Sequence, residues 1–518
     1  MRRYGILAFF AFACLAFAAV WLGGLNQDEG WYLYAANLVS EGEIPYRDFF
    51  FTQGPVMPVV YSAFTGVWRH GGILGARIFT LAIGSLGILF AVALARRLVP
   101  RERRTEAGIL VFFLLGCNLY HLYYNAIPKT YALAGLFIVL GFYLLSFVES
   151  SRRMVRIAVL LGSGAAFALA AGTRISLGVL LAVVGIGLLL RCRLYGSAFL
   201  CFGVGGALVL ALVFGGLLVN PETRAGLLAA QHYHAARGGF DPVFAVGSLS
   251  RLVRWYLPTF LLLGLGAFAA RVVVSTKAEQ PTGSIVTLLL LAGAVAVFAV
   301  QILAPFPYED YQVPIMGILS VFAAVLCVRR LRCGFPLVLL ALGLSWACSF
   351  GSPLLEKWMT NGQDRFWTLK KSSCELAQLR DVARRVETMD PGGTTLLTQD
   401  LYLAIETNRR VPHGLEMGPF SYWGEKVPSS VDGRMVLDDR SLRELLAAAP
   451  CEIAALSSYT FAITVPEGVE TPRERQMEYW RMLERRYELV FSEAAFGQNA
   501  TTLLVLKRKN KLSKEASR

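Results

Sequence analysis

Two adjacent acids, Asp28 and Glu29, follow the first apolar segment of the chain, within the stretch NQDEGWYLYAANLVSEGEIPYRDFFFTQGP. A pair of opposite charge, Arg47 and Asp48, lies further along the same stretch. A carboxylate in such a place can act as the general base that takes a proton from an attacking hydroxyl group. The alternative is a solvated loop whose tryptophan and tyrosines anchor the chain among lipid headgroups.

The apolar residues after these acids have helical spacing. They predict a short helix that begins at Asp28 and lies in the plane of the membrane interface. Its lipid-facing side would carry Tyr32, Ala35, Ala36 and Val39. Both acids would then lie where the first apolar segment leaves the membrane.

Further charges occur in three other polar segments. YHLYYNAIPKTY contains Lys129, and AGTRIS contains Arg174. The third segment, APFPYEDYQVP, contributes Tyr308, Glu309, Asp310 and Tyr311. Charges at membrane depth are costly unless they are paired or functional. If these segments share one face of the membrane, they predict a cavity that opens on that face.

The composition identifies the class of protein. Of the residues, 55% are apolar and 17% are charged, whereas soluble domains carry about 25% charged residues. The net charge is +14, but the arginines fall in short clusters between apolar runs. That distribution is typical of membrane proteins with cytoplasmic basic loops. We therefore expect a membrane protein and no nucleic-acid partner.

Apolar runs of spanning length recur along the first 350 residues. They lie near 5–25, 73–95, 107–121, 130–148, 157–190, 197–219, 256–272, 284–304, 313–328 and 335–350. The run 157–190 is too long for one helix, so it predicts two helices joined at Thr173 and Arg174. We take the first run as an uncleaved helix. The expected fold class is a polytopic α-helical membrane protein with about eleven spans over residues 1–350.

Basic clusters indicate the orientation of these spans. The clusters are Arg2 and Arg3, Arg96 to Arg104, Arg152, Arg153 and Arg156, Arg191 and Arg193, Arg271 and Lys277, and Arg329, Arg330 and Arg332. Because they fall at alternate ends of the spans, those ends are expected to face the cytoplasm. The segments 26–72, 120–130, 220–255 and 304–312, the Arg174 hairpin and the C-terminal region would face outward. The predicted location is a bacterial cytoplasmic membrane, with the N-terminus inside.

From residue 351 the composition is that of a water-soluble domain. Residues 351–508 predict an extracytoplasmic α/β domain, and 509–518 form a basic tail. We expect a helix at 375–387 and strands at 394–398, 451–458, 487–494 and 501–508. Capping boxes are expected at Ser441 with Glu444, and at Thr471 with Glu474. No glycine-rich phosphate loop follows these strands, so a nucleotide site is not predicted.

Taken together, these features resemble the GT-C membrane glycosyltransferases that use polyprenyl-phosphate sugars. The resemblance is to the bacterial family 39/83 type, which includes protein mannosyltransferases and aminoarabinose transferases. It is carried by the stretch after the first helix, AGTR at 171–174, FPYEDYQVP and the C-terminal domain, and it covers essentially the whole chain. The resemblance implies that Asp28 is the catalytic acid of the first outer loop, with Glu29 beside it. Relatives often carry another acid in the second outer loop, where this chain has Asn125 and Lys129.

The chemistry of such a donor explains why one acid could suffice. A sugar on a lipid phosphate leaves behind a phosphate, so the reaction needs cations near that phosphate rather than the paired carboxylates of glycosidases. We assign the donor phosphate to Arg174, Lys129 and Arg47, because arginine in particular can bind two oxygens at once. Asp28 would take the acceptor proton in a single displacement with inversion at the sugar carbon. The residues assigned to the substrate cavity are Asp48, Tyr308, Glu309, Asp310 and Tyr311.

Structural alternatives exist for the main candidates. Asp28 could be the N-cap of the predicted helix, and Glu29 could pair with a cation. Arg174 could pair with an acid, and Lys129 could be a lysine that snorkels to the interface. Arg47 and Asp48 could likewise pair with each other. His232 and His234 have an i, i+2 spacing that a metal site in a loop could use, but without further ligands a solvated loop is favoured.

The sequence leaves other functions open. A lipid-linked-sugar flippase or transporter would need charges inside the spans, and a catalytically inactive relative is a third alternative. The acceptor could be a lipid, a glycan or a protein. The nine cysteines include no C-x-x-C and no paired Cys/His spacing, so no metal is predicted, although Asp28 with Glu29 could hold a divalent ion. Cys374 and Cys451 lie in the predicted outer domain, where a disulfide is chemically allowed.

Overall fold

The computed structural model describes most of the chain, and it divides into two compact units. The described residues are 2–149, 152–191, 197–273, 285–330, 338–340, 342–343, 347, 374–424, 435–466 and 468–509. The first unit, here the helical unit, comprises Met1–Val20, Ile78–Gly216 and Gly239–Trp358. The second, here the mixed unit, comprises Trp21–Arg77, Leu217–Gly238 and Met359–Arg518. The predicted first outer loop thus belongs to the same unit as the C-terminal region.

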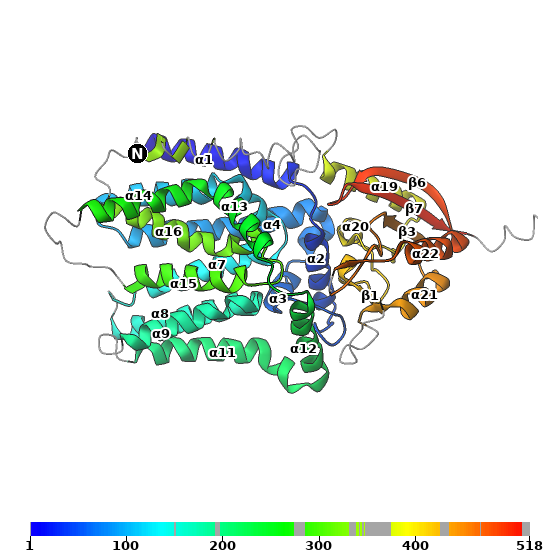
Figure 1. The fold of residues 1–518 in the computed structure, drawn as a ribbon, viewed down its shortest axis with the longest axis horizontal. Coiled ribbons are helices and arrows are strands. Elements are labelled where there is room, and N and C mark those ends of the chain that lie inside the picture. The colour runs from blue at the N-terminus through cyan, green and yellow to red at the C-terminus, as the bar shows by residue number, and fades with distance from the viewer. Residues whose placement is uncertain are drawn as a thin grey trace, which may run out of the picture. The chain divides into compact units, whose positions relative to one another are not determined.

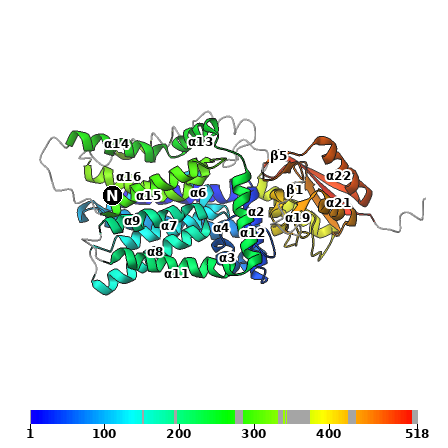
Figure 2. The same cartoon turned by 60° about the horizontal axis from the view of Figure 1, so that its bottom comes forward.

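The helical unit is built from long apolar helices that lie side by side (Figure 1, Figure 2). Its helices are α1 Arg2–Phe17, α4 Gly66–Arg97, α5 Arg104–Gly116, α6 Leu119–Ala126, α7 Thr130–Leu145, α8 Arg153–Thr173, α9 Val179–Leu190, α11 Ala198–Val219, α13 Pro242–Trp255, α14 Leu257–Val273, α15 Ile285–Ile302 and α16 Val313–Arg330. A π-helical turn, Ala18–Leu22, continues α1, and 3₁₀ turns cover Arg101–Arg103, Ile175–Gly178 and Glu309–Gln312. The first part of α4 belongs to the mixed unit.

Among the described residues, six helices are long and apolar enough to cross a membrane, or seven if the bent pair around Cys117 is one span. Three shorter apolar helices are Thr130–Leu145, Ile175–Leu190 and Leu257–Phe268. The predicted run 335–350 lies mostly outside the described residues. The structure therefore supports a helical membrane protein but does not confirm a count of about eleven spans.

Charged side chains mark the two ends of the helical unit. The arginine clusters at 96–104, 152–156 and 329–330 lie where α4, α7 and α16 end and where α5 and α8 begin. Arg97 donates from Nε to the carbonyl of Ser146 at 3.2 Å, which joins two of these ends. The opposite helix ends carry Lys129, Arg174 and Asp310. Arg193, Lys277 and Arg332 of the predicted basic clusters lie outside the described residues.

The mixed unit combines short helices with small sheets. Its elements besides the start of α4 are α2 Gln27–Ser40, α3 Val56–Ser62, α12 Pro221–Ala236, α19 Glu375–Met389, α20 Leu401–Glu406, a 3₁₀ turn Gly418–Phe420, β1 Tyr422–Gly424, β2 Leu437–Asp438, α21 Asp439–Ala448, β3 Ile453–Ser457, β4 Ile463–Thr464, β5 Val469–Glu470, α22 Arg473–Arg486, β6 Tyr487–Phe496 and β7 Thr501–Arg508. The largest sheet has the order β3-β7-β6 and is antiparallel throughout (Figure 1).

The predicted elements of the C-terminal region are mostly confirmed, but their caps are not. The helix predicted at 375–387 and three of the four strands are present. Residues 394–398 make only isolated bridges rather than a strand. The cap of α21 is Asp438, whose side chain accepts from the backbone N–H of Ser441, so the predicted box at Ser441 is displaced. Helix α22 has Pro472 at its N-cap position and no side-chain cap. The tail beyond Lys509 lies outside the described residues.

Candidate active site

Helix α2 begins one residue before the predicted start, and its cap is not Asp28. Asn26 is the N-cap, and its Oδ1 accepts from the backbone N–H of Asp28 at 3.0 Å. Glu29 completes a capping box by accepting from the backbone N–H of Asn26 at 2.9 Å. Such a reciprocal pair satisfies two donors that a helix start would leave unbonded. The alternative role of Asp28 as a helix cap is therefore wrong.

Glu29 also forms a buried ion pair with Arg77 of α4, the last residue of the segment Trp21–Arg77 of the mixed unit. Arg77 donates from Nη2 to Oε1 at 2.6 Å and from Nε to Oε2 at 2.9 Å, and both side chains are completely buried. The same guanidinium donates to the carbonyls of Gly23 and Gly24 at 2.9 and 2.8 Å. Glu29 thus fixes the start of α2 against α4, and the structural alternative for this acid is what the geometry shows.

Asp28 lies on the second residue of α2 and is half-buried. Its Oδ1 accepts from the indole Nε1 of Trp31 at 3.0 Å. That indole is itself buried and stacks on the ring of Tyr32, with 3.8 Å between the centroids. The carboxylate is therefore oriented by a rigid aromatic neighbour, while its neighbours Asn26 and Glu29 supply the cap and the ion pair.

The predicted lipid-facing side of α2 is wrong. Tyr32, Ala35 and Ala36, expected on the lipid-facing side, are at most 2% exposed. The helix packs against α3 and α20 within the mixed unit. Buried residues occur on every face of α2, so its apolar side chains form protein core rather than a membrane surface.

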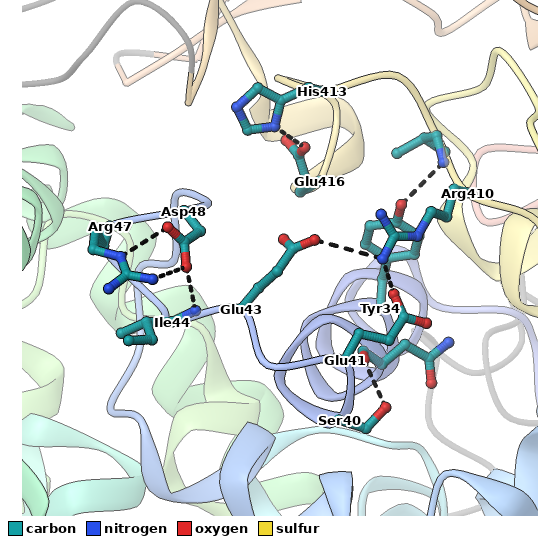
Figure 3. A network of polar contacts seen from close by, with 12 residues as sticks. Tyr34, Ser40, Glu41, Glu43, Ile44, Arg47, Asp48, Arg410, His413 and Glu416 are labelled. Atoms are coloured by element: carbon teal, nitrogen blue, oxygen red, sulfur yellow. Dashed lines mark hydrogen bonds and ion pairs between the residues drawn. The ribbon is translucent and has the colours of Figure 1, made fainter.

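Arg47 and Asp48 form a local pair on the surface of the mixed unit (Figure 3). Arg47 donates from Nε and Nη2 to the two carboxylate oxygens of Asp48, at 2.8 and 2.7 Å. Asp48 also accepts from the backbone N–H of Ile44 at 2.7 Å. These hydrogen bonds hold the pKa of Asp48 below its usual range, with the Arg47 contribution the largest. Pairing between the two, the structural alternative, is thus observed.

Three further acids of the mixed unit, Glu41, Glu43 and Glu416, lie near this pair (Figure 3). Arg410 pairs with Glu41, and its Nη2 lies 3.6 Å from Glu43. His413 contacts Glu416 at 2.7 Å, and the buried hydroxyl of Tyr34 accepts from the backbone N–H of Val411 at 3.0 Å. Burial raises the pKa of Glu43, an effect that Arg410 opposes. This cluster joins the loop after α2 to the segment that follows α20.

The helical unit brings the other predicted cations together with an acid. Lys129 precedes α7, and its Nζ donates to Oδ2 of Asp310 at 2.9 Å. The hydroxyl of Tyr131 donates to the same oxygen, also at 2.9 Å. Lys129 and Asp310 are 7% and 8% exposed, so this is a buried pair rather than a snorkelling lysine. Asp310 itself lies in the 3₁₀ turn before α16.

Arg174 completes this group, here the cation cluster, defined by Lys129, Tyr131, Arg174, Asp310 and Tyr311. It is the first residue after α8 and has extended backbone torsions, φ −148° and ψ 109°. Its guanidinium lies 4.4 Å from the ring centroid of Tyr311 and 5.2 Å from that of Tyr131. The helix break predicted at Thr173 and Arg174 is therefore confirmed, and it directs the arginine onto two aromatic faces.

Glu309 and Tyr308 lie at the edge of this cluster. Glu309 accepts from Nε of Arg251 at 3.0 Å, an ion pair between α13 and the 3₁₀ turn. Tyr308 is 39% exposed, and its ring lies 5.8 Å from that of Tyr311. Of the two predicted acids, Asp310 thus contacts Lys129, whereas Glu309 contacts a cation that the sequence did not single out.

Asn125, a residue of the predicted second outer loop, is turned into the helical core. It is 5% exposed, and its Nδ2 donates to the carbonyl of His121 at 2.8 Å. A Cβ placed on Gly84 would meet the Cβ of Asn125 at 2.6 Å. The adjacent cavity, lined among others by His121, Asn125 and Tyr131, has a volume of about 20 Å³, room for about one water molecule. Asn125 therefore has a packing role.

No group of three His, Cys, Asp or Glu side chains that could hold a metal ion occurs among the described residues. His232 and His234 lie in α12 rather than in a loop, and Nε2 of His234 lies 2.8 Å from the carbonyl of Thr52. Cys374 and Cys451 are both free thiols. The two histidines therefore lie in a packed helix, and the two cysteines form no disulfide.

Sequence reasoning missed several residues that position the candidates. Arg77 was counted within an apolar run, although an arginine in such a run is a signal for a buried acidic partner. Tyr131 lies two residues after Lys129, and its hydroxyl was not considered as a donor. Gln27 and Asp400, which form a buried hydrogen bond of 3.0 Å, carried no recognisable pattern.

Comparisons with known proteins agree on the fold. No protein-family model matches the chain, and no curated protein does. The crystal structure of ArnT from Cupriavidus metallidurans bound to undecaprenyl phosphate is similar, with a TM-score of 0.65 and 15% identity. The structure of the same protein in the apo state gives a TM-score of 0.62 and 15% identity. Each alignment covers 98% of both chains. At this identity the likeness establishes the fold, which the chain shares with that protein over nearly its whole length.

Proposed function

We propose that this protein is an integral-membrane glycosyltransferase that moves a sugar from a polyprenyl-phosphate donor to an acceptor hydroxyl group. The reaction takes place on the outer face of a bacterial cytoplasmic membrane. The fold supports this proposal, because it is shared over nearly the whole length with a protein that was crystallised with undecaprenyl phosphate. Undecaprenyl phosphate is a polyprenyl phosphate, the lipid part of the kind of donor that the sequence resemblance implies.

The cation cluster is the observation that carries the proposal. It brings two buried cations, Lys129 and Arg174, close to the aromatic rings of Tyr131 and Tyr311. Buried cations stabilise the negative charge of a phosphate group more strongly than exposed ones do. Arginine suits a phosphate because its planar fork can contact two oxygens. In this proposal Asp310 and Tyr131 hold Lys129 in place, and Arg174 binds the donor phosphate.

Asp28 is the proposed general base. The helix cap and the ion pair at the start of α2 are provided by Asn26 and Glu29, and the indole of Trp31 orients the Asp28 carboxylate. In the proposed step the acceptor oxygen attacks the sugar carbon while its proton passes to Asp28. The bond from that carbon to the phosphate oxygen breaks, and the phosphate leaves with the electron pair. A single displacement of this kind inverts the sugar carbon.

The remaining candidates have smaller proposed roles. Glu29 acts on α2 through Arg77 rather than on the substrate. Arg47 and Asp48, already paired with each other, shape the loop after α2, and a phosphate contact by Arg47 would require that this pair opens. The cations of the cluster serve the phosphate, so the proposal does not require a divalent metal. The acceptor is a hydroxyl group of a lipid, a glycan or a protein.

The test is a transfer assay with purified full-length protein. It would be incubated with polyprenyl-phosphate sugars and a panel of lipid, glycan and peptide acceptors. The proposal expects release of polyprenyl phosphate together with a glycosylated acceptor. Movement of intact donor lipid between leaflets, with no glycosylated product, would instead identify a flippase and overturn the proposal.

A further inference from the structure

Three hydrogen bonds from the C-terminal region reach the chain immediately before Asp28, all within the mixed unit. Oε2 of Glu375 accepts from the backbone N–H of Leu25 at 2.5 Å. The backbone N–H of Gln27 donates to Oε1 of Gln498 at 2.7 Å. The Gln27 side chain donates from Nε2 to Oδ1 of Asp400 at 3.0 Å. The residue preceding Asp28 is thus held by both its backbone and its side chain.

The Asp400 side chain is buried and hydrogen-bonded to Gln27. Asp400 lies directly before α20 and is 2% exposed. Besides Gln27, the hydroxyl of Tyr402 donates to its Oδ1 at 2.7 Å. Burial raises the pKa of Asp400, and the hydrogen bonds from Gln27 and Tyr402 oppose that rise. A buried acid is costly unless it is hydrogen-bonded, so the Gln27 contact is part of what keeps this site stable.

Helix α20 also contacts α2 at its first turn. A Cβ placed on Gly30 would meet the backbone nitrogen of Tyr402 at 2.4 Å, so only glycine fits there. Asp28 is therefore flanked on one side by the Gln27 contact to Asp400 and on the other by a backbone contact to Tyr402. Both contacts come from the same short helix.

The chain near Ile73, at the end of the predicted first outer loop, also contacts α20. Glu406, the last residue of α20, accepts from the backbone N–H of Ile73 at 2.8 Å. Arg380 of α19 donates to Glu406 at 3.2 Å and to the carbonyl of Gly71, also at 3.2 Å. The six-residue helix α20 thus contacts both ends of the segment 27–73, which contains Asp28.

We propose that α20 of the C-terminal domain is a positioning element for the active site, which fixes the Asp28 carboxylate through the hydrogen bond between Asp400 and Gln27. This inference rests on the proposed role of Asp28 as the general base. Asp28 is the next residue after Gln27, so a shift of α2 at Gln27 moves the carboxylate with it. Misplacing a catalytic group by about 1 Å can lower a rate by about 10²-fold. The domain then acts on kcat without contacting the substrate through Asp400.

The test uses full-length protein and substitutions at both ends of the hydrogen bond. Asp400→Leu and Gln27→Leu each remove the bond, whereas Asp400→Asn keeps an oxygen that accepts from Gln27. The matched control is Asp439→Leu, because Asp439 is an acid of the same domain that accepts from Tyr422 and Tyr479. It has no described hydrogen bond to residues 21–30.

Two readouts separate positioning from general stability. The first is the split between kcat and the KM for the donor, and the second is amide hydrogen exchange in the peptide around Gln27. We expect Asp400→Leu and Gln27→Leu to lower kcat about 10²-fold with a nearly unchanged donor KM, and to speed exchange at α2. Asp400→Asn should rescue both readouts, and Asp439→Leu should leave both near native values.

The inference is overturned if exchange at α2 and kcat stay native in Gln27→Leu, a variant that leaves Asp400 in place and guards against misfolding of the leucine variant at 400. An equal loss of kcat in Asp439→Leu would also overturn it, because the effect would then be general. If native protein transfers no sugar, the proposed function fails. Exchange alone then decides the positioning: faster exchange in both leucine variants supports it, and native exchange overturns it.

Discussion

The start of α2 and the cation cluster each bury an arginine, but they contact it differently. All three guanidinium nitrogens of Arg77 donate hydrogen bonds to Glu29 or to the carbonyls of Gly23 and Gly24. Arg174 instead presents its flat face to the rings of Tyr131 and Tyr311. Contacts along the edge of a guanidinium engage the groups that bind anions, whereas contacts on its face do not.

This difference separates a structural arginine from a candidate ligand-binding one. The charge of Arg77 is matched by Glu29 in a bidentate pair with no exposure. In the cation cluster, Asp310 lies beside Lys129, and its described hydrogen bonds come from Lys129 and Tyr131. Two buried arginines can thus differ in the part of the guanidinium that their described contacts engage.

The largest expected effect is on stability, when the buried ion pair between Arg77 and Glu29 is broken. Arg77→Leu leaves Glu29 buried without its cation, which should lower the free energy of unfolding by about 3–5 kcal/mol. Arg47→Leu is the control, because the side chains of Arg47 and Asp48 are 35% and 30% exposed. Its effect should stay below about 1 kcal/mol. Thermal unfolding in detergent measures both, and equal shifts for the two variants would contradict the comparison.

The next effect concerns Arg174, the proposed phosphate-binding arginine. Arg174→Gln should weaken binding of undecaprenyl phosphate by about tenfold to a hundredfold, because it removes charge-assisted hydrogen bonds of about 1.5–3 kcal/mol. Arg174→Lys keeps the charge but loses the planar fork, so it should fall between. Arg103→Gln, at the opposite helix ends, is the control. Direct binding of the lipid is the measurement, and a native affinity for Arg174→Gln would remove this arginine from the site.

A smaller effect is expected at the contact between α2 and α20. Gly30→Ala places a methyl group against the backbone of Tyr402, and such overpacking costs about 1–3 kcal/mol. In Gly71→Ala the new methyl group meets nothing within 4 Å, so its stability should be unchanged or slightly higher. Unfolding of the two variants in parallel tests the close approach. Native stability in Gly30→Ala would show that the two helices can separate at little cost.

The smallest effect is a dependence of stability on pH at the acidic cluster after α2. The folded state raises the pKa of Glu43 above its ordinary value of 4.5, mainly through burial. The protonated form is thus favoured on folding, so this contribution is complete below pH 4.5 and is lost as the pH rises through the raised pKa. Glu43→Gln should make the unfolding temperature less sensitive to pH in that window. An unchanged slope in the variant would exclude Glu43 as its source.

The pKa of Asp48 shifts in the opposite direction from that of Glu43, so Asp48 serves as the comparison. Its pKa is lowered in the folded state, chiefly by Arg47, so its contribution is present above the ordinary value of 3.8 and is lost as the pH falls. Asp48→Asn should therefore lower stability at neutral pH and not in acid. The pair is partly exposed, so the change should be below about 1 kcal/mol.

Sequence patterns predicted which segments form helices and strands better than they predicted what covers those elements. The break between α8 and α9 followed from a run that is too long for one span and is interrupted by AGTRIS at 171–176. Strand β7 matches its predicted bounds, because β-branched and leucine residues fill a short segment bounded by polar ones. Helix α2 was correctly expected as a helix, but the lipid face was wrong. Apolar spacing gives the period of a helix and not whether lipid or protein covers it.

The site was predictable only in part, for a related reason. Asp28, Lys129 and Arg174 could be chosen because charges next to apolar runs are conspicuous. The partner of Glu29 lies 48 residues away along the chain, and that of Lys129 lies 181 residues away, so neither pairing leaves a local pattern. Helix α20 is short and carried no cap signal, although it packs directly on α2.

The central claim, that Asp28 is the base of a sugar transfer, is tested most directly by the turnover rate of Asp28→Asn at saturating donor. Asparagine has nearly the same shape and can still accept from Trp31, so the fold should be retained, as thermal unfolding would confirm. A positioned general base contributes about 10²–10⁴-fold to the rate. The account predicts a loss of that size in kcat with donor binding unchanged. A variant that transfers sugar at the native rate would contradict it.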